Sequence, residues 1–366
     1  MGSPLRVLHV VVNMNRGGAE TLLMNLYRNI DRDKVQFDFL TCKEGVFDAE
    51  IEQLGGKIHR IPYISEVGHF GYIKELKNFL TENNHYKIIH AHMDKMSGLV
   101  LREANKAGIP IRISHSHNTS SEGGIASKIY KWYAGKAIRS NATNLFACSK
   151  TAAKWLFKNN TNPIHIIKNG IECEKFSFSQ ETREEVRTEL NFKNNQLVLG
   201  HVGRFNHQKN HGFLIHLFEK YHKINPNSVL ILIGDGPLRL DIQKKVEKLK
   251  LEDHVKFMGV RNDIHRLLHA FDLFIFPSLH EGLPVSLIEA QAAGLKCLIS
   301  ENISREVDMG IHLVEFLPIN DTNIWLEKIN NTKVNRSISI NSLVNHGYEI
   351  KGTAVNIEKF YLKISG

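Results

Sequence analysis

The sequence predicts an α/β protein with two doubly wound parallel sheets, each in a domain of its own. The chain has 366 residues, more than a single compact core usually holds. In both halves, short apolar runs of strand length alternate with segments of helical spacing. The composition, 42% hydrophobic with a mean hydropathy of -0.24, is that of a globular protein. No apolar run reaches the roughly 18 residues that span a bilayer.

The first half opens with a strand, a glycine loop and a helix. Residues 5–12 are almost all apolar, and the apolar spacing over residues 21–29 is helical. Between them lie Gly17 and Gly18, which let a backbone approach a ligand closely but are equally typical of a tight turn. The segment Asp31 to Asp33 has the D-x-D spacing of a metal motif, but it follows a helix, so we interpret it as a turn. Further strands are predicted at residues 37–41, 57–61, 88–92, 111–115, 144–147 and 164–167.

The second half repeats this scheme. Strands are predicted at residues 197–202, 229–233, 255–258, 273–276 and 296–300, with helices between them. The boundary between the two domains is predicted near residues 168–175, and a last helix is predicted at residues 353–364.

Two carboxylates flank a strand-to-helix turn in the second half. Residues 274–276 predict a buried strand, Pro284 suits the first position of a helix, and Gly294 suits the residue after its end. The free N–H groups of that helix N-terminus favour an anion. Glu281 precedes the helix and Glu289 lies within it, where both can accept hydrogen bonds from hydroxyl groups. The arrangement predicts a site for a phosphorylated, hydroxyl-rich ligand; the alternative is that both are ordinary acids beside a helix.

Two glycine-containing loops follow other strands of the second half. Gly203 begins a loop that contains two cations, Arg204 and Lys209, which could neutralise a diphosphate. Gly234 and Gly236 form a turn at the end of the next strand, where open α/β sheets bind ligands. On spacing alone, solvated cations and an ordinary turn explain these loops equally well.

Two histidines, His115 and His117, end a predicted strand of the first half. Their spacing of two residues places both side chains on the same side of the strand. Paired histidines are typical of metal sites, but the spacing shows no third ligand, so we predict that no metal binds.

The segment Glu281 to Ala290 resembles the E-x7-E motif of glycosyltransferase family 4, the retaining GT-B enzymes that use nucleotide-sugar donors. The resemblance covers most of the chain. Gly203 to Lys209 is similar to the family's G-R-x(4)-K pattern, Gly234 to Pro237 to its G-x-G-P segment, and Asn169 to Glu172 to its N-G-(I/V)-(D/E) segment. The resemblance implies a GT-B fold, in which two Rossmann-like domains face a cleft. The implied parts are an acceptor-side domain at residues 1–170, a nucleotide-sugar domain at 171–348 and a helix at 349–366 that crosses back to the first domain.

The resemblance also implies roles for individual residues. Arg204 and Lys209 would bind the diphosphate. Glu281 would hold hydroxyls of the donor sugar, and Glu289 would hold the ribose. His117, with His115 as the alternative, would contact the donor sugar and its phosphate region. The implied catalytic residues are Arg204, Lys209, Glu281 and His117. The implied donor-binding positions are Gly17, Gly18, Gly203, Gly234, Gly236, Arg261, Gly282, Leu283, Val285 and Glu289, with the backbone near Arg261 beside the nucleobase.

The implied activity is a metal-independent transfer of a hexosyl or N-acetylhexosaminyl group from a nucleotide diphosphate sugar, with UDP as the expected nucleotide and no cofactor. The similarity is closest to bacterial exopolysaccharide and capsule glycosyltransferases, so we expect a growing, lipid-linked saccharide as acceptor. Two departures bear on donor preference. Leu283 and Pro284 replace the commoner Phe-Gly, and only Glu306 matches a later acidic position of the family.

The positive charge is concentrated in the first half. Residues 1–170 contain 23 Lys and Arg against 14 Asp and Glu, whereas the remaining residues contain 24 of each. No acid occurs from residue 123 to 171, and aromatic residues are interleaved with the cations, namely Tyr130, Trp132, Tyr133 and Trp155. The pattern fits an anionic membrane surface or a pyrophosphate-linked lipid; the alternative is a solvated basic helix with its aromatics in the core. The cations are Lys128, Lys131, Lys136, Arg139, Lys150, Lys154 and Lys158, of which the last three follow helical spacing after Ser149, a predicted N-cap.

Two other functional classes fit parts of the sequence. A nucleotide-sugar epimerase shares the GT-B architecture and the donor site but needs no acceptor surface. A nucleic-acid-binding protein would explain the charge, but no recognised module occurs and the second half is balanced, so we expect no nucleic-acid partner. The four cysteines are scattered, and the first 12 residues lack a signal-peptide cleavage region. We therefore expect a cytoplasmic protein, or one peripheral to the inner face of the plasma membrane.

Overall fold

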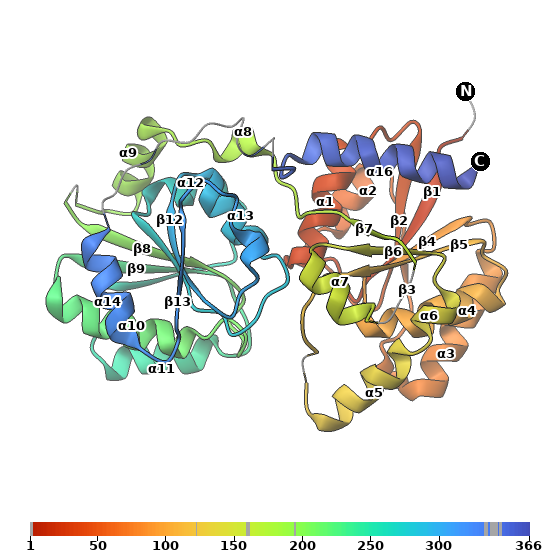
Figure 1. Cartoon of the computed structure of the whole chain (residues 1–366), viewed down its shortest axis with the longest axis horizontal. Coiled ribbons are helices and arrows are strands. Elements are labelled where there is room, and N and C mark those ends of the chain that lie inside the picture. The colour runs from red at the N-terminus through yellow and green to blue at the C-terminus, as the bar shows by residue number, and fades with distance from the viewer. Residues whose placement is uncertain are drawn as a thin grey trace. The chain divides into compact units, whose positions relative to one another are not determined.

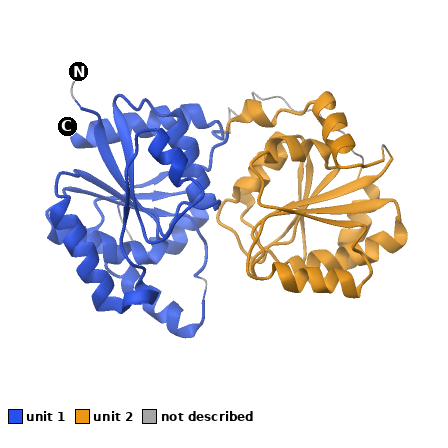
Figure 2. Ribbon diagram, turned by 180° about the vertical axis from the view of Figure 1, so that it is seen from behind, with its two compact units in different colours: residues 1–171, 347–366 blue, residues 172–346 orange. Residues whose placement is uncertain are grey.

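The computed structural model describes residues 3–121, 123–158, 162–193, 195–332, 336, 343 and 346–366. The chain divides into two compact units, which we call the first unit (residues 1–171 and 347–366) and the second unit (residues 172–346), as Figure 2 shows by colour. Each unit contains a parallel sheet with helices on both faces (Figure 1), so the predicted α/β class is confirmed. No helix within the described ranges is both long and apolar enough to cross a membrane.

The sheet of the first unit has the strand order β3-β2-β1-β4-β5-β6-β7, and each paired neighbour is parallel. The chain runs from β1 to β2 on one side and returns to β4 on the other, so the order reverses between β1 and β4. The strands are β1 (Leu5–Val10), β2 (Val35–Thr41), β3 (Ile58–Arg60), β4 (Ile88–Ala91), β5 (Ile111–Ser116), β6 (Asn144–Ala147) and β7 (Ile164–Ile166). The helices are α1 (Gly18–Asn29), α2 (Asp48–Gln53), α3 (Ile64–Glu82), the 3-10 helix η1 (Asp94–Met96), α4 (Ser97–Lys106), α5 (Ile125–Gly135), α6 (Ile138–Asn141), α7 (Lys150–Leu156) and α16 (Ile350–Ser365).

Alternate residues of β1 pack on opposite faces of this sheet. Val7 belongs to a buried cluster that includes residues of α1 together with Ile357 and Tyr361 of α16. Leu8 belongs to a second cluster with residues of α3 and α4 on the other face. This alternation follows from the period of two in a strand, and it explains why residues 5–12 are almost continuously apolar. The last helix of the chain is therefore part of the core of the first unit.

The sheet of the second unit has the order β10-β9-β8-β11-β12-β13 and is also parallel. Leu199 on β8 and Leu230 on β9 pack with Trp325 of α14 in one buried cluster. The strands are β8 (Leu197–Val202), β9 (Ser228–Ile233), β10 (Val255–Gly259), β11 (Leu273–Phe276), β12 (Lys296–Ser300) and β13 (Val314–Leu317). The helices are α8 (Cys173–Phe176), α9 (Gln180–Glu189), α10 (His211–Ile224), α11 (Arg239–Lys248), α12 (Ile264–Ala270), α13 (Val285–Ala292), the 3-10 helix η2 (Arg305–Val307) and α14 (Thr322–Asn331).

Three local predictions differ from the structure. Strand β13 was not predicted, because it lies at the sheet edge and Glu315 interrupts its short apolar run. Pro284 precedes α13 instead of beginning it, since its ψ of 120° is extended while its carbonyl accepts a bond from the Leu287 N–H, as an N-cap does. Helix α7 ends at Leu156, so Lys158 lies beyond the helix on which it was placed.

Other local predictions are confirmed. The Ser149 hydroxyl accepts a hydrogen bond from the Ala152 N–H and caps α7. Gly294 follows α13 with a φ of +73°, as a glycine after a helix end does. Asp31 lies in a turn after α1, with its carboxylate accepting from the Asp33 N–H.

Candidate functional site

Two loops of the second unit leave its sheet at the point where the strand order reverses. Strand β8 lies between β9 and β11; the chain runs from β8 to β9 on one side and reaches β11 on the other. In open α/β sheets, loops that leave such strands diverge and open a crevice at the carboxyl ends. Lys209 follows β8 and Glu281 follows β11, so both lie at that edge of the sheet.

The structure brings Lys209 and Glu281 into contact. The Lys209 Nζ lies 2.6 Å from the Glu281 Oε1 and 4.5 Å from the centre of the Phe276 ring. Their loops are also tied together, because the Gln208 side-chain amide donates to the His280 carbonyl at 2.8 Å. The side chains of the ion pair are only 14% and 9% exposed, so little water screens the charges. Two residues that the sequence separates by 72 positions therefore form one charged centre.

Arg204 is a second cation on the loop that carries Lys209. Its side chain is exposed and makes no hydrogen bond or ion pair with the residues that the structure describes. Lys209, in contrast, already has a carboxylate partner. The loop that carries both cations begins at Gly203, directly after β8.

The glycines of the turn after β9 pack against the Arg204 loop. A Cβ on Gly234 would lie 2.2 Å from the Gly203 carbonyl oxygen, and one on Gly236 would lie 2.6 Å from the Phe205 carbonyl oxygen. The φ of Gly234 is also +136°, which side chains disfavour. The Phe205 N–H donates to the Asp235 carbonyl at 3.0 Å. These glycines thus allow two backbones to meet and hold the Arg204 loop in place.

Glu289 lies inside α13, one turn beyond its start, and is partly buried. Burial raises the pKa of Glu289 to about 7. Gly282, Leu283 and Val285 of the same segment are buried, and the first turn of α13 contains no acid that would compete with an anion. The guanidinium of Arg261 bonds both oxygens of Asp263 at 2.8 and 2.7 Å, so the backbone is what this position offers to a ligand.

In the first unit, the two predicted loop glycines differ in their surroundings. Gly18 begins α1, and a Cβ there would meet nothing within 4 Å. A Cβ on Gly17 would lie 2.3 Å from the Glu20 carboxylate. Both follow β1, beside the reversal of strand order between β1 and β4. Open space at Gly18 suits the approach of a ligand to the backbone.

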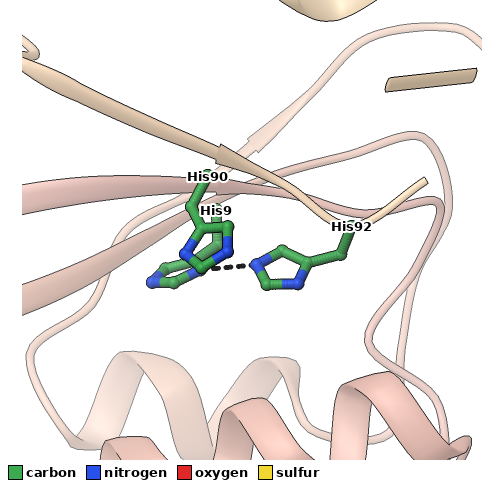
Figure 3. A group of neighbouring side chains, drawn as sticks. All are labelled: His9, His90 and His92. Atoms are coloured by element: carbon green, nitrogen blue, oxygen red, sulfur yellow. Dashed lines mark hydrogen bonds between the residues drawn. The ribbon is translucent and has the colours of Figure 1, made fainter. Parts of the chain in front are cut away.

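The structure corrects the argument about the histidine pair. His115 and His117 lie on the same side as predicted, with ring centres 4.0 Å apart. Three further histidines, His9, His90 and His92, join them, and His9, His90 and His92 offer ring nitrogens within 4.8 Å of one another (Figure 3). His92, His115 and His117 form a second group of this kind, so the structure provides a third histidine that the spacing of the pair does not reveal. Strands β1, β4 and β5 are neighbours in the sheet, so their histidines at alternating positions meet; strand order is the signal that spacing lacks.

All five histidines of this cluster are held neutral. Burial lowers the pKa of His9 and of His117 to about 3, and it lowers the pKa of the other three well below the usual value. The buried ring nitrogens His9 Nε2 and His117 Nδ1 make no hydrogen bond with the described residues. The cluster can therefore bind hydrogen-bond donors or acceptors, but it does not supply positive charge at neutral pH.

The basic stretch has an apolar, exposed side. Trp132 and Tyr133 of α5 are 55% and 52% exposed, so the alternative that these aromatics are core residues is wrong for both. Ile125 and Ile129 of the same helix are 80% and 61% exposed. Tyr130 is half-buried, and its hydroxyl bonds His69 of α3 at 2.6 Å. Helix α5 therefore presents large apolar side chains and cations to solvent together.

Two family models match the chain. The model of Glycosyltransferase Family 4 matches residues 16–175, and that of Glycosyl transferases group 1 matches residues 182–330. EpsF of Bacillus subtilis, which is named as a glycosyltransferase, is 39% identical over 335 residues, covering 89% of this chain and 87% of that protein. The UDP-Gal:α-D-GlcNAc-diphosphoundecaprenol α-1,3-galactosyltransferase of Escherichia coli is 27% identical, covering 81% and 80%. The capsular polysaccharide biosynthesis glycosyltransferase CapH of Staphylococcus aureus is 28% identical, covering 83% of each chain.

Solved structures share the fold over the whole chain. Anabaena HepE, crystallised in complex with UDP, has a TM-score of 0.77 at 20% identity and covers 98% of this chain and 100% of its own. Sucrose-phosphate synthase of Thermosynechococcus elongatus has a TM-score of 0.76 at 16% identity and covers 98% of each chain. At these low sequence identities, the structural similarity supports only the assignment of the fold.

Proposed function

Because the chain belongs to the family 4 glycosyltransferases and has the GT-B fold, we propose that it transfers a hexosyl or N-acetylhexosaminyl group from a UDP-sugar, with retention of configuration and without a metal. The proposed acceptor is a growing, lipid-linked saccharide of an exopolysaccharide or capsule. The observation that carries the proposal is the partly buried Lys209–Glu281 pair at the reversal of strand order in the second unit, where Lys209 shares its loop with Arg204.

The names of similar proteins support the donor and the acceptor. HepE was crystallised with UDP and with UDP-glucose, which favours a uridine nucleotide. The Escherichia coli relative uses UDP-Gal and a sugar attached to a diphosphate lipid. CapH, whose name states capsular polysaccharide biosynthesis, favours a saccharide acceptor of that kind.

In the proposed reaction, the bond between the donor sugar carbon and the diphosphate oxygen breaks, and its electron pair leaves with UDP. Arg204 and Lys209 neutralise the charge that develops on that oxygen. The acceptor hydroxyl attacks the same face of the sugar, and its proton passes to the departing phosphate. Lys209 has three N–H donors, so it can bind a phosphate while it keeps a bond to Glu281. Glu281 then holds sugar hydroxyls, and Glu289 holds the ribose.

The donor site is tested by thermal unfolding with UDP, GDP, ADP and their sugars in the presence of EDTA. A ligand that binds only the folded state raises its stability by RT ln(1 + [L]/Kd). We expect the uridine series alone to raise the melting temperature, and Arg204→Ala to weaken this effect. The control is Arg239→Ala, because Arg239 is a cation of the same unit that pairs with Asp235. No shift with any nucleotide would refute the donor site, and epimerisation of a UDP-sugar without acceptor would favour an epimerase.

We further propose that α5 binds an anionic membrane surface, which would bring the enzyme to a lipid-linked acceptor. Phe70 of α3 is 87% exposed, and the bond between His69 and Tyr130 ties its helix to α5. Apolar side chains that insert and cations that attract anionic lipids are the two parts of an interfacial helix. A hollow of about 220 Å³ beside this helix is lined by Lys136, Arg139 and Lys158, which gathers three of the predicted cations.

Vesicle sedimentation tests this surface. We expect binding to vesicles that contain phosphatidylglycerol, weak binding to phosphatidylcholine, and loss of binding with Ile129→Ala and Phe70→Ala together. Leu240→Ala is the matched control, since Leu240 is a 69% exposed apolar residue of the second unit. Equal sedimentation of both variants would remove α5 as the membrane surface.

A further inference from the structure

Three of the clustered histidines form a hydrogen-bonded row. His9 Nδ1 lies 3.0 Å from His92 Nε2, and His92 Nδ1 lies 2.9 Å from His117 Nε2. In both pairs the ring centres are 5.2 Å apart and the rings are tilted by only 28° and 32°. The rings therefore meet edge to edge through their nitrogens, which is good hydrogen-bond geometry, as Figure 3 shows for His9 and His92. His92 uses both of its nitrogens and joins β1 to the end of β5.

The other two histidines stack on this row without extending it. The ring of His90 lies 4.2 Å from that of His92, and the ring of His115 lies 4.0 Å from that of His117. His90 bonds the Tyr361 hydroxyl of α16, whereas neither nitrogen of His115 bonds a described residue. His115 thus shares the surroundings of the row but not its hydrogen bonds.

A metal ion fits this arrangement poorly. A metal bound to imidazole lies in the ring plane at roughly 2.0 to 2.1 Å from each nitrogen. The head-on nitrogens of His9 and His92 are 3.0 Å apart, so an ion between them would have to push the rings apart. Stacked rings, such as those of His90 and His92, direct their lone pairs alongside one another instead of toward one point. The geometry favours shared protons over a shared ion.

The row has two ways to place its protons. Each neutral imidazole has one N–H and one lone pair, so the two bonds form together only if all three N–H groups point the same way along the row. In one state His117 Nδ1 carries a proton and can donate to a ligand. In the other state His117 Nδ1 has no proton, and its lone pair can accept a hydrogen bond from a hydroxyl group. His9 Nε2 then carries a proton instead. The presence or absence of a proton at one end of the row therefore determines whether the nitrogen at the other end carries one.

We propose that His9 and His92 are positioning residues that determine which nitrogen of His117 carries its proton. The proposal rests on the proposed role of His117 at the donor site. His117 is held from its other side as well, since its backbone N–H donates to Asp94 Oδ1 at 3.0 Å. Asp94 has a φ of +47°, an uncommon value for a residue with a side chain, and such strain is typical of functional sites. The ring of His117 is thus oriented by His92 and its backbone by Asp94.

Histidine-specific 15N NMR tests the proposal, because ring-nitrogen shifts distinguish the two neutral tautomers. The His117 signals are assigned with His117→Gln, and the variants are His9→Phe and His115→Phe. His9→Phe removes the inner end of the row while leaving His117 and His92 in place. His115→Phe is the matched control, since it replaces a buried imidazole of the same cluster that makes no bond in the row. We expect the tautomer ratio of His117 to change in His9→Phe and to stay as in the wild type in His115→Phe.

Kinetics and metal analysis complete the test. If the protein transfers sugar from UDP-sugars, we expect His9→Phe to lower kcat roughly three- to tenfold, the effect of one neutral hydrogen bond, with little change in donor KM. An unchanged His117 tautomer ratio in His9→Phe would overturn the proposal, as would one equivalent of a transition metal bound to the purified protein and lost in His92→Phe. If the His117 tautomer ratio changes in His9→Phe but the wild-type protein has no transferase activity, the positioning role of the row is supported and the proposed function is refuted.

Discussion

Glu289 gives the sharpest test of the site in the second unit. Burial raises its pKa from the usual 4.5 to about 7 in the folded chain. Below pH 4.5 the carboxyl is protonated in both the folded and the unfolded state, so it contributes nothing to the pH dependence. Between pH 4.5 and 7 the unfolded state has lost a proton that the folded state keeps, so the free energy of unfolding falls as the pH rises.

The size of this effect follows from the shift. One pKa unit corresponds to about 1.36 kcal/mol, so a shift of about 2.5 units destabilises the folded state by at most about 3 kcal/mol above pH 7. Glu289→Gln keeps the shape of the side chain and removes the titration. The variant should therefore match the wild type near pH 4.5 and exceed it by up to about 3 kcal/mol at pH 8.

Urea unfolding followed by tryptophan fluorescence measures this difference. Trp325 is fully buried in the second unit, whereas Trp132 and Trp155 lie in the first. A background with both first-unit tryptophans replaced by Phe makes the signal report the second unit alone. If the free energies of unfolding of Glu289→Gln and of the parent change in parallel between pH 5 and 8, the raised pKa of Glu289 is refuted.

The same carboxyl couples nucleotide binding to protons. Ribose hydroxyls donate to an ionised carboxylate and lower its pKa, so UDP binding should release protons between about pH 6 and 7. Calorimetry in two buffers of different ionisation enthalpy measures the number released. We expect more proton release in the parent than in Glu289→Gln, because the terminal phosphate of UDP, which titrates at about pH 6, also releases protons when cations bind it. Equal release in both would remove Glu289 from the ribose site.

Two further substitutions test the loops of the second unit, and a third tests the glycine loop of the first unit. Lys209→Ala should lower turnover by roughly a hundredfold or more with the fold intact, because it removes a cation from the developing charge; Lys223→Ala, which removes an exposed lysine, should leave turnover unchanged. Gly234→Ala should lower the urea midpoint of the second unit by the equivalent of about 2 kcal/mol or more, since its Cβ would lie 2.2 Å from the Gly203 carbonyl oxygen at a φ of +136°. Gly18→Ala should leave stability within about 0.5 kcal/mol and lower turnover, because its Cβ enters open space that we assign to ligand; unchanged kinetics would contradict that assignment.

The interior strands could be predicted because they are buried on both faces and therefore read as continuous apolar runs. Strand β9, for example, was placed to within one residue. Strand β13 could not be found in this way. It lies at the edge of the sheet, only Leu317 of its four residues is buried, and Glu315 pairs with Lys328.

The contacts within the sites depend on strand order, which local pattern does not contain. Lys209 and Glu281 were each assigned to a binding role, but the ion pair between them arises because β8 and β11 are neighbours. For the same reason, the spacing of His115 and His117 did not reveal that His9 and His92 lie in the same cluster. Resemblance to a family could supply roles for residues but not the geometry that joins them.

The return of the chain to its first unit has a consequence for synthesis. Residues 172–346 emerge from the ribosome before α16, whose Ile357 and Tyr361 belong to the core of the first unit. At roughly 5 to 20 residues per second, the nascent first unit waits on the order of 10 to 40 seconds for α16, and until then the part of the sheet face that α16 covers stays exposed. The second unit can fold in that interval, so its core can be complete before the core of the first unit is. An apolar face uncovered for so long is a natural target for a chaperone.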